Sequence, residues 1–141
     1  MKLPYKEADK KFTMAVFKEK LCVCSSKTPV IYSIKLSEIP DQGQFQEFFT
    51  VQNAEDPQPP ADVFICGVVN EKLLLSIARQ HRFLLIDEEG KAIQVFLGID
   101  EIQGRAAAVH NDVLYVADCR PSEGKYYVRK FEQSAKHDTK L

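Results

Sequence analysis

The chain has 141 residues, of which 45% are hydrophobic and 28% charged. This length and composition suit one soluble domain with its own core, so we expect residues 1–141 to form a single domain. The 19 basic and 20 acidic side chains leave a formal net charge of −1, which excludes a global field that would steer the protein to nucleic acid or to an anionic membrane. RNA is therefore a less favoured partner than protein, and no membrane partner is expected.

The first residues, MKLPYKEADKK, are rich in charge. A signal peptide would need a continuous apolar stretch at this place, and no later run approaches the roughly 18 apolar residues of a membrane span. We therefore expect a cytoplasmic or nuclear protein that is not secreted through a classical signal peptide. Residues 1–11 and 133–141 are predicted to be flexible tails.

Between these ends, the apolar segments are short, rich in β-branched or aromatic residues, and bounded by turn residues, which indicates strands. Most connections are tight and fit antiparallel hairpins, whereas the proline-rich residues 53–62 form a long loop. The predicted strands, in chain order, are residues 12–17, 20–25, 29–36, 45–51, 62–69, 72–78, 82–87, 91–97, 105–110, 113–118 and 125–131. The predicted fold class is all-β, built from consecutive antiparallel meanders.

Three segments of the chain repeat one pattern. They are AVFKEKLCV from Ala15, GVVNEKLLL from Gly67 and AVHNDVLYV from Ala108. Each has a valine before a predicted turn, an acidic residue within it and a leucine after it. Self-similarity at intervals of about 40–50 residues is typical of repeated supersecondary units. We interpret the chain as three units, at about residues 12–52, 61–99 and 104–132.

The third unit contains NDVLYVAD, residues 111–118. This stretch resembles the motif in blades of NHL-type and related six-bladed β-propellers, and the resemblance is clear only over residues 108–118. The chain has no tryptophan, unlike WD40 blades, and no Gly-Gly doublet of the kelch kind. The resemblance implies a toroidal binding platform, often for proteins and in some members for RNA. A minority of such propellers are metal-dependent hydrolases.

About three propeller-like blades are fewer than a closed ring normally has. The chain would therefore be a fragment of a larger propeller, or part of a ring that an oligomer completes. The alternative is a different closed structure, an up-and-down β-barrel or a sandwich. Pairing of two copies would cover the open strand edges, which are otherwise an aggregation hazard, and would give a six-bladed ring.

The four cysteines suit reduced, buried or half-buried positions with a structural role. Cys22 and Cys24 form a C-x-C pair whose side chains share one face of a strand. A metal site would need further ligands at suitable spacing, and the three histidines are scattered along the chain. We therefore predict no metal and no cofactor.

The loops that join the second and third strands of each unit should gather at one end of the sheets, because each turn in a meander reverses the chain. Residues 25–29, 79–81 and 119–124 form such a set, together with the long loop. The candidate binding patch at this end of the sheets consists of Lys27, Arg79, His81, Arg82 and Arg120. Arginines in such a patch hold carboxylates or phosphates bidentately, although charged residues also belong on exposed loops where nothing binds.

No catalytic residues are predicted. The chain lacks G-x-S-x-G, a phosphate-binding glycine loop and H-E-x-x-H. A divalent-metal site would need carboxylates that converge from several units, and the counterparts of Asp118 are Ser25 and Ile77. We expect a non-catalytic protein-binding or scaffold module, with a protein partner or self-association. The alternatives are a β-barrel carrier of a small apolar ligand and a metal-dependent propeller hydrolase.

Overall fold

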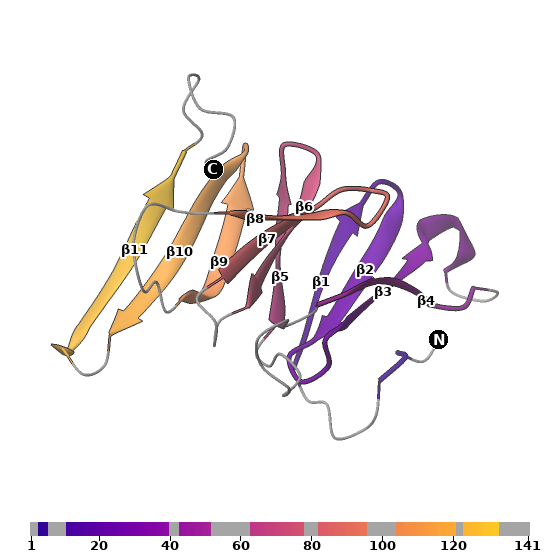
Figure 1. Cartoon of the computed structure of the whole chain (residues 1–141), viewed down its shortest axis with the longest axis horizontal. Helices are drawn as coiled ribbons and strands as arrows, with labels where there is room; N and C mark the ends of the chain where they lie inside the picture. The colour runs from indigo at the N-terminus through magenta and orange to yellow at the C-terminus, as the bar shows by residue number, and fades with distance from the viewer. Residues whose placement is uncertain are drawn as a thin grey trace.

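The computed structural model describes residues 3–5, 11–39, 43–51, 63–77, 82–95, 104–120 and 123–132 (Figure 1). Its strands are β1 (Phe12–Phe17), β2 (Lys20–Ser25), β3 (Val30–Lys35), β4 (Gln46–Thr50), β5 (Val63–Val69), β6 (Lys72–Ile77), β7 (Arg82–Ile86), β8 (Ala92–Val95), β9 (Gly104–His110), β10 (Val113–Arg120) and β11 (Lys125–Phe131). A short 3-10 helix, η1 (Leu36–Glu38), follows β3. Over the described ranges, no helix has the length and apolar character needed to span a membrane. Most of the residues in the predicted tails, 1–11 and 133–141, lie outside these ranges.

The strands form three separate antiparallel sheets of consecutive strands. The first sheet has the order β1-β2-β3-β4, the second β5-β6-β7-β8, and the third β11-β10-β9. The predicted all-β fold of consecutive meanders is therefore confirmed, and each sheet uses the strands of one repeat segment. The described strands do not join into the single closed barrel that was the alternative. That residues 1–141 form one domain stays a prediction.

Several strand ends differ by one residue from the sequence prediction, and the end of β10 differs by two. β10 continues to Arg120, whereas the sequence predicted its end at residue 118 and a loop over 119–124. The reason is pairing within the β10-β11 hairpin, because Cys119 and Arg120 lie opposite Tyr126 and Lys125 of β11. A bulge between Ala117 and Asp118 adjusts the pairing with β9 on the other side.

Three tight turns, which we call the turn row, join the first two strands of each sheet. Their residues and φ angles are Lys18 (49°) and Glu19 (61°), Asn70 (48°) and Glu71 (62°), and Asn111 (49°) and Asp112 (60°). Positive φ at both central residues is typical of type I′ turns, whose twist suits antiparallel hairpins. The repeated sequence pattern therefore corresponds to one backbone conformation formed three times.

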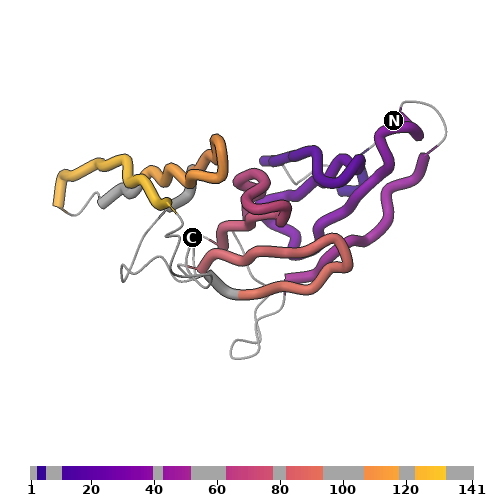
Figure 2. The backbone as a smooth tube through the Cα atoms, turned by 90° about the horizontal axis from the view of Figure 1, so that it is seen from above, coloured from indigo at the N-terminus to yellow at the C-terminus, as the bar shows by residue number. Residues whose placement is uncertain are grey.

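The second sheet is buried on both faces. One buried cluster joins it to the first sheet and includes Phe17, Cys22, Ile31, Leu75 and Ile86. The other joins it to the third sheet and includes Leu74, Phe83, Leu85, Leu114 and Val116. Side chains alternate along a strand, so neighbouring residues of β6 serve different clusters. Seen from above, the first and third sheets extend to opposite sides (Figure 2).

The first strand of each sheet lies beside the first strand of the next. β1 contacts β5, and β5 in turn contacts β9. The turns that follow these strands lie at the same end of the sheets, the upper end in Figure 1. The three sheets therefore form a stack with an inner row of strands and two outer ends.

Candidate interaction surface

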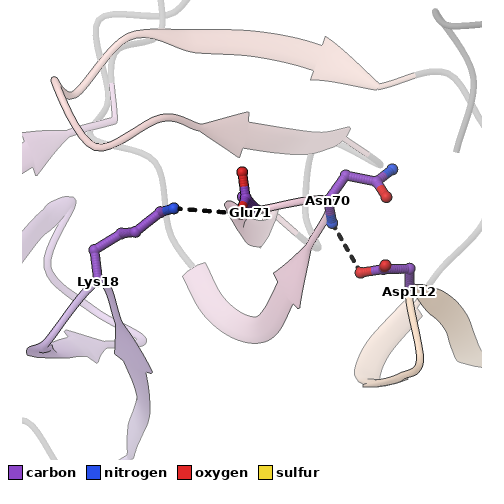
Figure 3. A network of polar contacts seen from close by, with 4 residues as sticks. All are labelled: Lys18, Asn70, Glu71 and Asp112. Carbon is purple, nitrogen blue, oxygen red and sulfur yellow. Dashed lines mark hydrogen bonds and ion pairs between the residues drawn. The ribbon is translucent and has the colours of Figure 1, made fainter.

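Polar contacts link the members of the turn row (Figure 3). The distance between Lys18 Nζ and Glu71 Oε1 is 3.8 Å, and the backbone N–H of Asn70 donates to Asp112 Oδ1 at 2.9 Å. In both links, the acidic residue of the following turn reaches the first residue of the preceding turn. Exposed pairs of this kind contribute at most about 1 kcal/mol each, so they fix the alignment of neighbouring sheets more than their stability.

The link between the second and third turns predicts a measurable effect. Replacing Asp112 by alanine removes the acceptor and leaves a less tolerant residue at positive φ, so we expect the free energy of unfolding to fall by about 1–2 kcal/mol. Asp112→Asn keeps an acceptor oxygen and tolerates this conformation, and it should stay within about 0.5 kcal/mol of the wild type. Urea denaturation measures both. Equal midpoints for wild type and Asp112→Ala would show that the link is not formed.

A pocket of about 480 Å³ lies beside the first turn. It is lined by Lys18, Glu19, Lys20, Lys35, Leu36 and Ser37. The antiparallel register brings two of these lysines together, because Lys20 lies opposite Lys35 in β2 and β3. The Lys20 ammonium also lies 6.0 Å from the ring centre of Phe48. This basic pocket was not predicted from the sequence, although the register of the predicted hairpin places Lys20 opposite Lys35.

The predicted basic patch falls on three different sheets. Lys27 lies in the turn after β2, where its backbone N–H donates to Ser25 Oγ at 3.3 Å. Arg82 begins β7, and the backbone of Arg120 ends β10. Arg79, His81 and the side chain of Arg120 lie outside the described part of the chain. A binding site made of these residues therefore stays a prediction.

The outer face of the first sheet exposes apolar side chains. Ala15 and Phe17 of β1 pack toward the second sheet, so the alternating Met14 and Val16 point the other way. These two side chains are 57% and 56% exposed. The ring of Tyr5 lies 5.6 Å from that of Phe12, and its hydroxyl donates to the carbonyl oxygen of Val23 at 2.7 Å. We call Phe12, Met14 and Val16 the first end face.

The outer face of the third sheet also exposes apolar side chains, together with Lys130, which lies opposite Tyr115. Leu114, Val116 and Phe131 pack toward the second sheet, so the alternating residues of β10 and β11 point outward. Val128 lies opposite Ala117 and is 75% exposed, and Tyr126 is 70% exposed. We call Tyr115, Tyr126 and Val128 the last end face. Neither end face was predicted from the sequence, because the exposure of these side chains depends on whether another sheet packs against them.

The predicted burial of the cysteines is confirmed for those that the structure describes. Cys22 and Cys24 are buried, and Cys66 is half-buried. Burial raises the pKa of the Cys22 thiol to about 11 and the pKa values of Cys24 and Cys66 to about 12. Cys24 Sγ donates to the carbonyl oxygen of Val63 at 3.3 Å. Among the residues that are described, no three His, Cys, Asp or Glu side chains group as metal ligands.

The raised thiol pKa values predict a loss of stability in alkali. Above pH 9.0, the ordinary pKa of a cysteine, the unfolded chain releases protons that the folded chain keeps. The contribution of these thiols to the free energy of unfolding should therefore be constant below about pH 8 and should fall as the pH rises from 9 to 12. Urea denaturation at pH 8 and pH 10.5 checks this. Cys24→Ala should show a smaller fall, and an equal fall would contradict the assignment to the thiol.

No protein-family model matches the chain, and no curated protein matches it in sequence. Its structure is similar to the crystal structure of virginiamycin B lyase from Staphylococcus aureus, with a TM-score of 0.57 and 13% sequence identity. The match covers 94% of this chain and 44% of that chain, so the chain spans less than half the length of that protein. That protein is a β-propeller, and the likeness supports a propeller-like fold.

Proposed function

We propose that the chain is a non-catalytic protein-binding module of β-propeller type that holds its partner on the third sheet. The observation that carries the proposal is the outer strand of that sheet. β4 and β8 occupy the fourth position in the first and second sheets, whereas β11 is the outermost strand of the third sheet among the described residues. Its Tyr126 and Val128 are also the most exposed large apolar residues of the described chain.

An outermost strand offers a row of backbone N–H and C=O groups that can pair with another chain. An extended segment of a partner can add to such an edge as a further strand, with backbone hydrogen bonds for affinity and side-chain contacts for specificity. The pairing of β3 with β4 and of β7 with β8 illustrates the position that this segment would take. The exposed tyrosine and valine of β11 would contact its side chains.

The proposal that the module is non-catalytic is based on the residues of this chain. The sequence has no nucleophile motif, and burial keeps the thiols of Cys22 and Cys24 protonated at neutral pH. The activity in the name of the lyase belongs to that protein, because a likeness at 13% identity concerns the fold.

A titration with a strand-forming peptide tests the proposal. The probe is a short synthetic peptide of alternating threonine and valine with a lysine at each end, followed by NMR of the labelled protein. We expect saturable shifts of the β11 amides, which Val128→Lys should weaken because it places a charge beside the added strand. The matched control peptide carries a proline in place of its central valine and should not bind. Absence of any shift in β11 at millimolar peptide would overturn the proposal.

A further inference from the structure

The turn row follows one rule along the chain. Glu71 of the second turn reaches Lys18 of the first, and Asp112 of the third turn reaches Asn70 of the second. Glu19 holds the same acidic position in the first turn, where no earlier turn of the described chain precedes it. Asn111 holds in the third turn the donating position that Lys18 and Asn70 hold in the first two, and no later turn follows it in the described residues. The row therefore ends in two complementary positions.

The end faces follow the same logic as the internal sheet contacts. Val16, Val68 and Val109 occupy equivalent positions, opposite Leu21, Leu73 and Leu114. Val68 packs against the cluster shared with the first sheet, and Val109 packs against the cluster shared with the second. Val16 is the equivalent residue of the first end face, and it is exposed. The second and third sheets bury this surface against the sheet that precedes them. In the first sheet, the same surface is exposed at Val16.

The last end face corresponds to the surfaces that the first two sheets bury against the sheet that follows. Cys22, Leu74 and Tyr115 are equivalent, because they lie opposite Ala15, Gly67 and Ala108. Cys22 and Leu74 are completely buried between sheets, whereas Tyr115 is half-buried. Each end face thus resembles one side of a contact that already exists twice within the chain.

We propose that a second copy of this chain docks its first end face on the last end face of the first copy, and that the reciprocal contact closes a two-copy ring. The proposal deepens the proposed function, because it names one partner of the third sheet. In this arrangement Glu19 of the second copy approaches Asn111 of the first, which continues the turn row. Two identical contacts, related by a two-fold axis, then bury the first and last end faces of both copies.

A second copy fits these faces better than an unrelated partner for a specific reason. The face that it brings repeats the valine and leucine pair, Val16 and Leu21, that Val68 and Leu73 form on the second sheet. It also brings an acidic turn residue to the place where both internal contacts have one. Continuity with the established internal contacts therefore favours a copy of this chain.

Light scattering coupled to size-exclusion chromatography tests the ring. We expect a mass twice the 16.0 kDa of one chain, which falls toward that of one chain on dilution. Val16→Lys should abolish the larger species. Asn111→Asp places two carboxylates together at each contact and should raise the dissociation constant about three- to thirtyfold, since the effect counts twice in the ring.

Changing the charges at residues 19 and 111 tests whether Glu19 of one copy contacts Asn111 of the other. Glu19→Lys should also weaken the ring, and its combination with Asn111→Asp should restore association by pairing opposite charges. Glu89→Lys is the matched control and should leave the mass unchanged, because Glu89 is an exposed acidic residue in the turn between β7 and β8 of the second sheet, whereas the end faces belong to the first and third sheets. Circular dichroism of each variant checks that it folds. Absence of rescue in the double variant overturns the turn contact.

The remaining outcomes separate this inference from the proposed function. A mass of one chain at every concentration up to about 1 mM, a range that covers weak association, overturns the ring. A series of larger oligomers overturns closure by two copies. Peptide binding to β11 of the Val16→Lys variant, measured together with a missing dimer in the wild type, would leave the proposed function intact and reject the ring. If the wild type forms a dimer but the Val16→Lys variant binds no peptide, the ring is kept and the proposed function is rejected.

Discussion

Replacing Leu75 by alanine is expected to lower the free energy of unfolding by about 2–5 kcal/mol, a large share of the stability of an ordinary domain. Leu75 lies in β6, is completely buried and belongs to the cluster between the first and second sheets. The substitution removes apolar contacts and leaves a cavity that sheets packed on both sides cannot easily close. Urea denaturation followed by circular dichroism measures the change.

The neighbouring residue makes this prediction specific to a stack of three sheets. Leu74 is also completely buried, but it belongs to the cluster with the third sheet. Leu74→Ala should therefore cost about as much as Leu75→Ala, roughly 2–5 kcal/mol. Ile93→Ala is the control, because Ile93 is 55% exposed, and it should cost at most about 1 kcal/mol. If only one of the two leucine variants is destabilised, the second sheet does not have two buried faces.

Adding a side chain at Gly67 is expected to destabilise the contact between the second and third sheets. Gly67 has a φ of +143° and lies at a bulge in β5. A Cβ added there would lie 3.1 Å from the Cβ of Val109 in β9, closer than ordinary packing allows. Gly67→Ala should lower the free energy of unfolding by about 1–3 kcal/mol, and Gly67→Val should lower it further.

Two further variants separate backbone strain from steric conflict at Gly67. Gly124 also has a positive φ, +66°, but an added Cβ there meets no atom within 4 Å, so Gly124→Ala reports strain alone and should cost about 1 kcal/mol. Combining Gly67→Ala with Val109→Gly removes both atoms that the added Cβ would meet, the Cβ of Val109 at 3.1 Å and its Cγ2 at 3.2 Å, so the double variant should lose less stability than the two single variants together. Strictly additive losses, measured by urea denaturation, would contradict the proposed contact.

The strands of this protein could be predicted from the sequence because their signals are local. Apolar runs such as residues 72–78 are bounded by turn residues, and the repeated acidic turns identify the hairpins that begin each sheet. The end of β10 was missed because residues 119–124 contain a proline and a glycine and were interpreted as a loop, whereas Cys119 and Arg120 pair with Tyr126 and Lys125. The repeat of valine, turn and leucine predicted the hairpins but not the contacts between them.

The candidate surfaces were harder to predict because they depend on contacts between sheets. The bonds from Glu71 and Asp112 to the preceding turns arise only when the sheets stack in chain order. Val16 and Val68 have the same place in the repeat, yet one is exposed and the other half-buried, because only Val68 has a sheet before it. Conversely, the basic patch that the sequence predicted falls on three sheets, with only Lys27 and Arg82 described in full.

Both proposals depend on the open stack of three sheets, and nuclear Overhauser effects in solution test that arrangement most directly. We predict a strong effect between the Hα protons of Gly67 and the methyl groups of Val109, because β5 lies beside β9 in this arrangement. A closed barrel would instead pair the first strand with the last. Backbone effects linking Phe12–Phe17 to Lys125–Phe131 as paired strands, without the contact between Gly67 and Val109, would contradict the open stack.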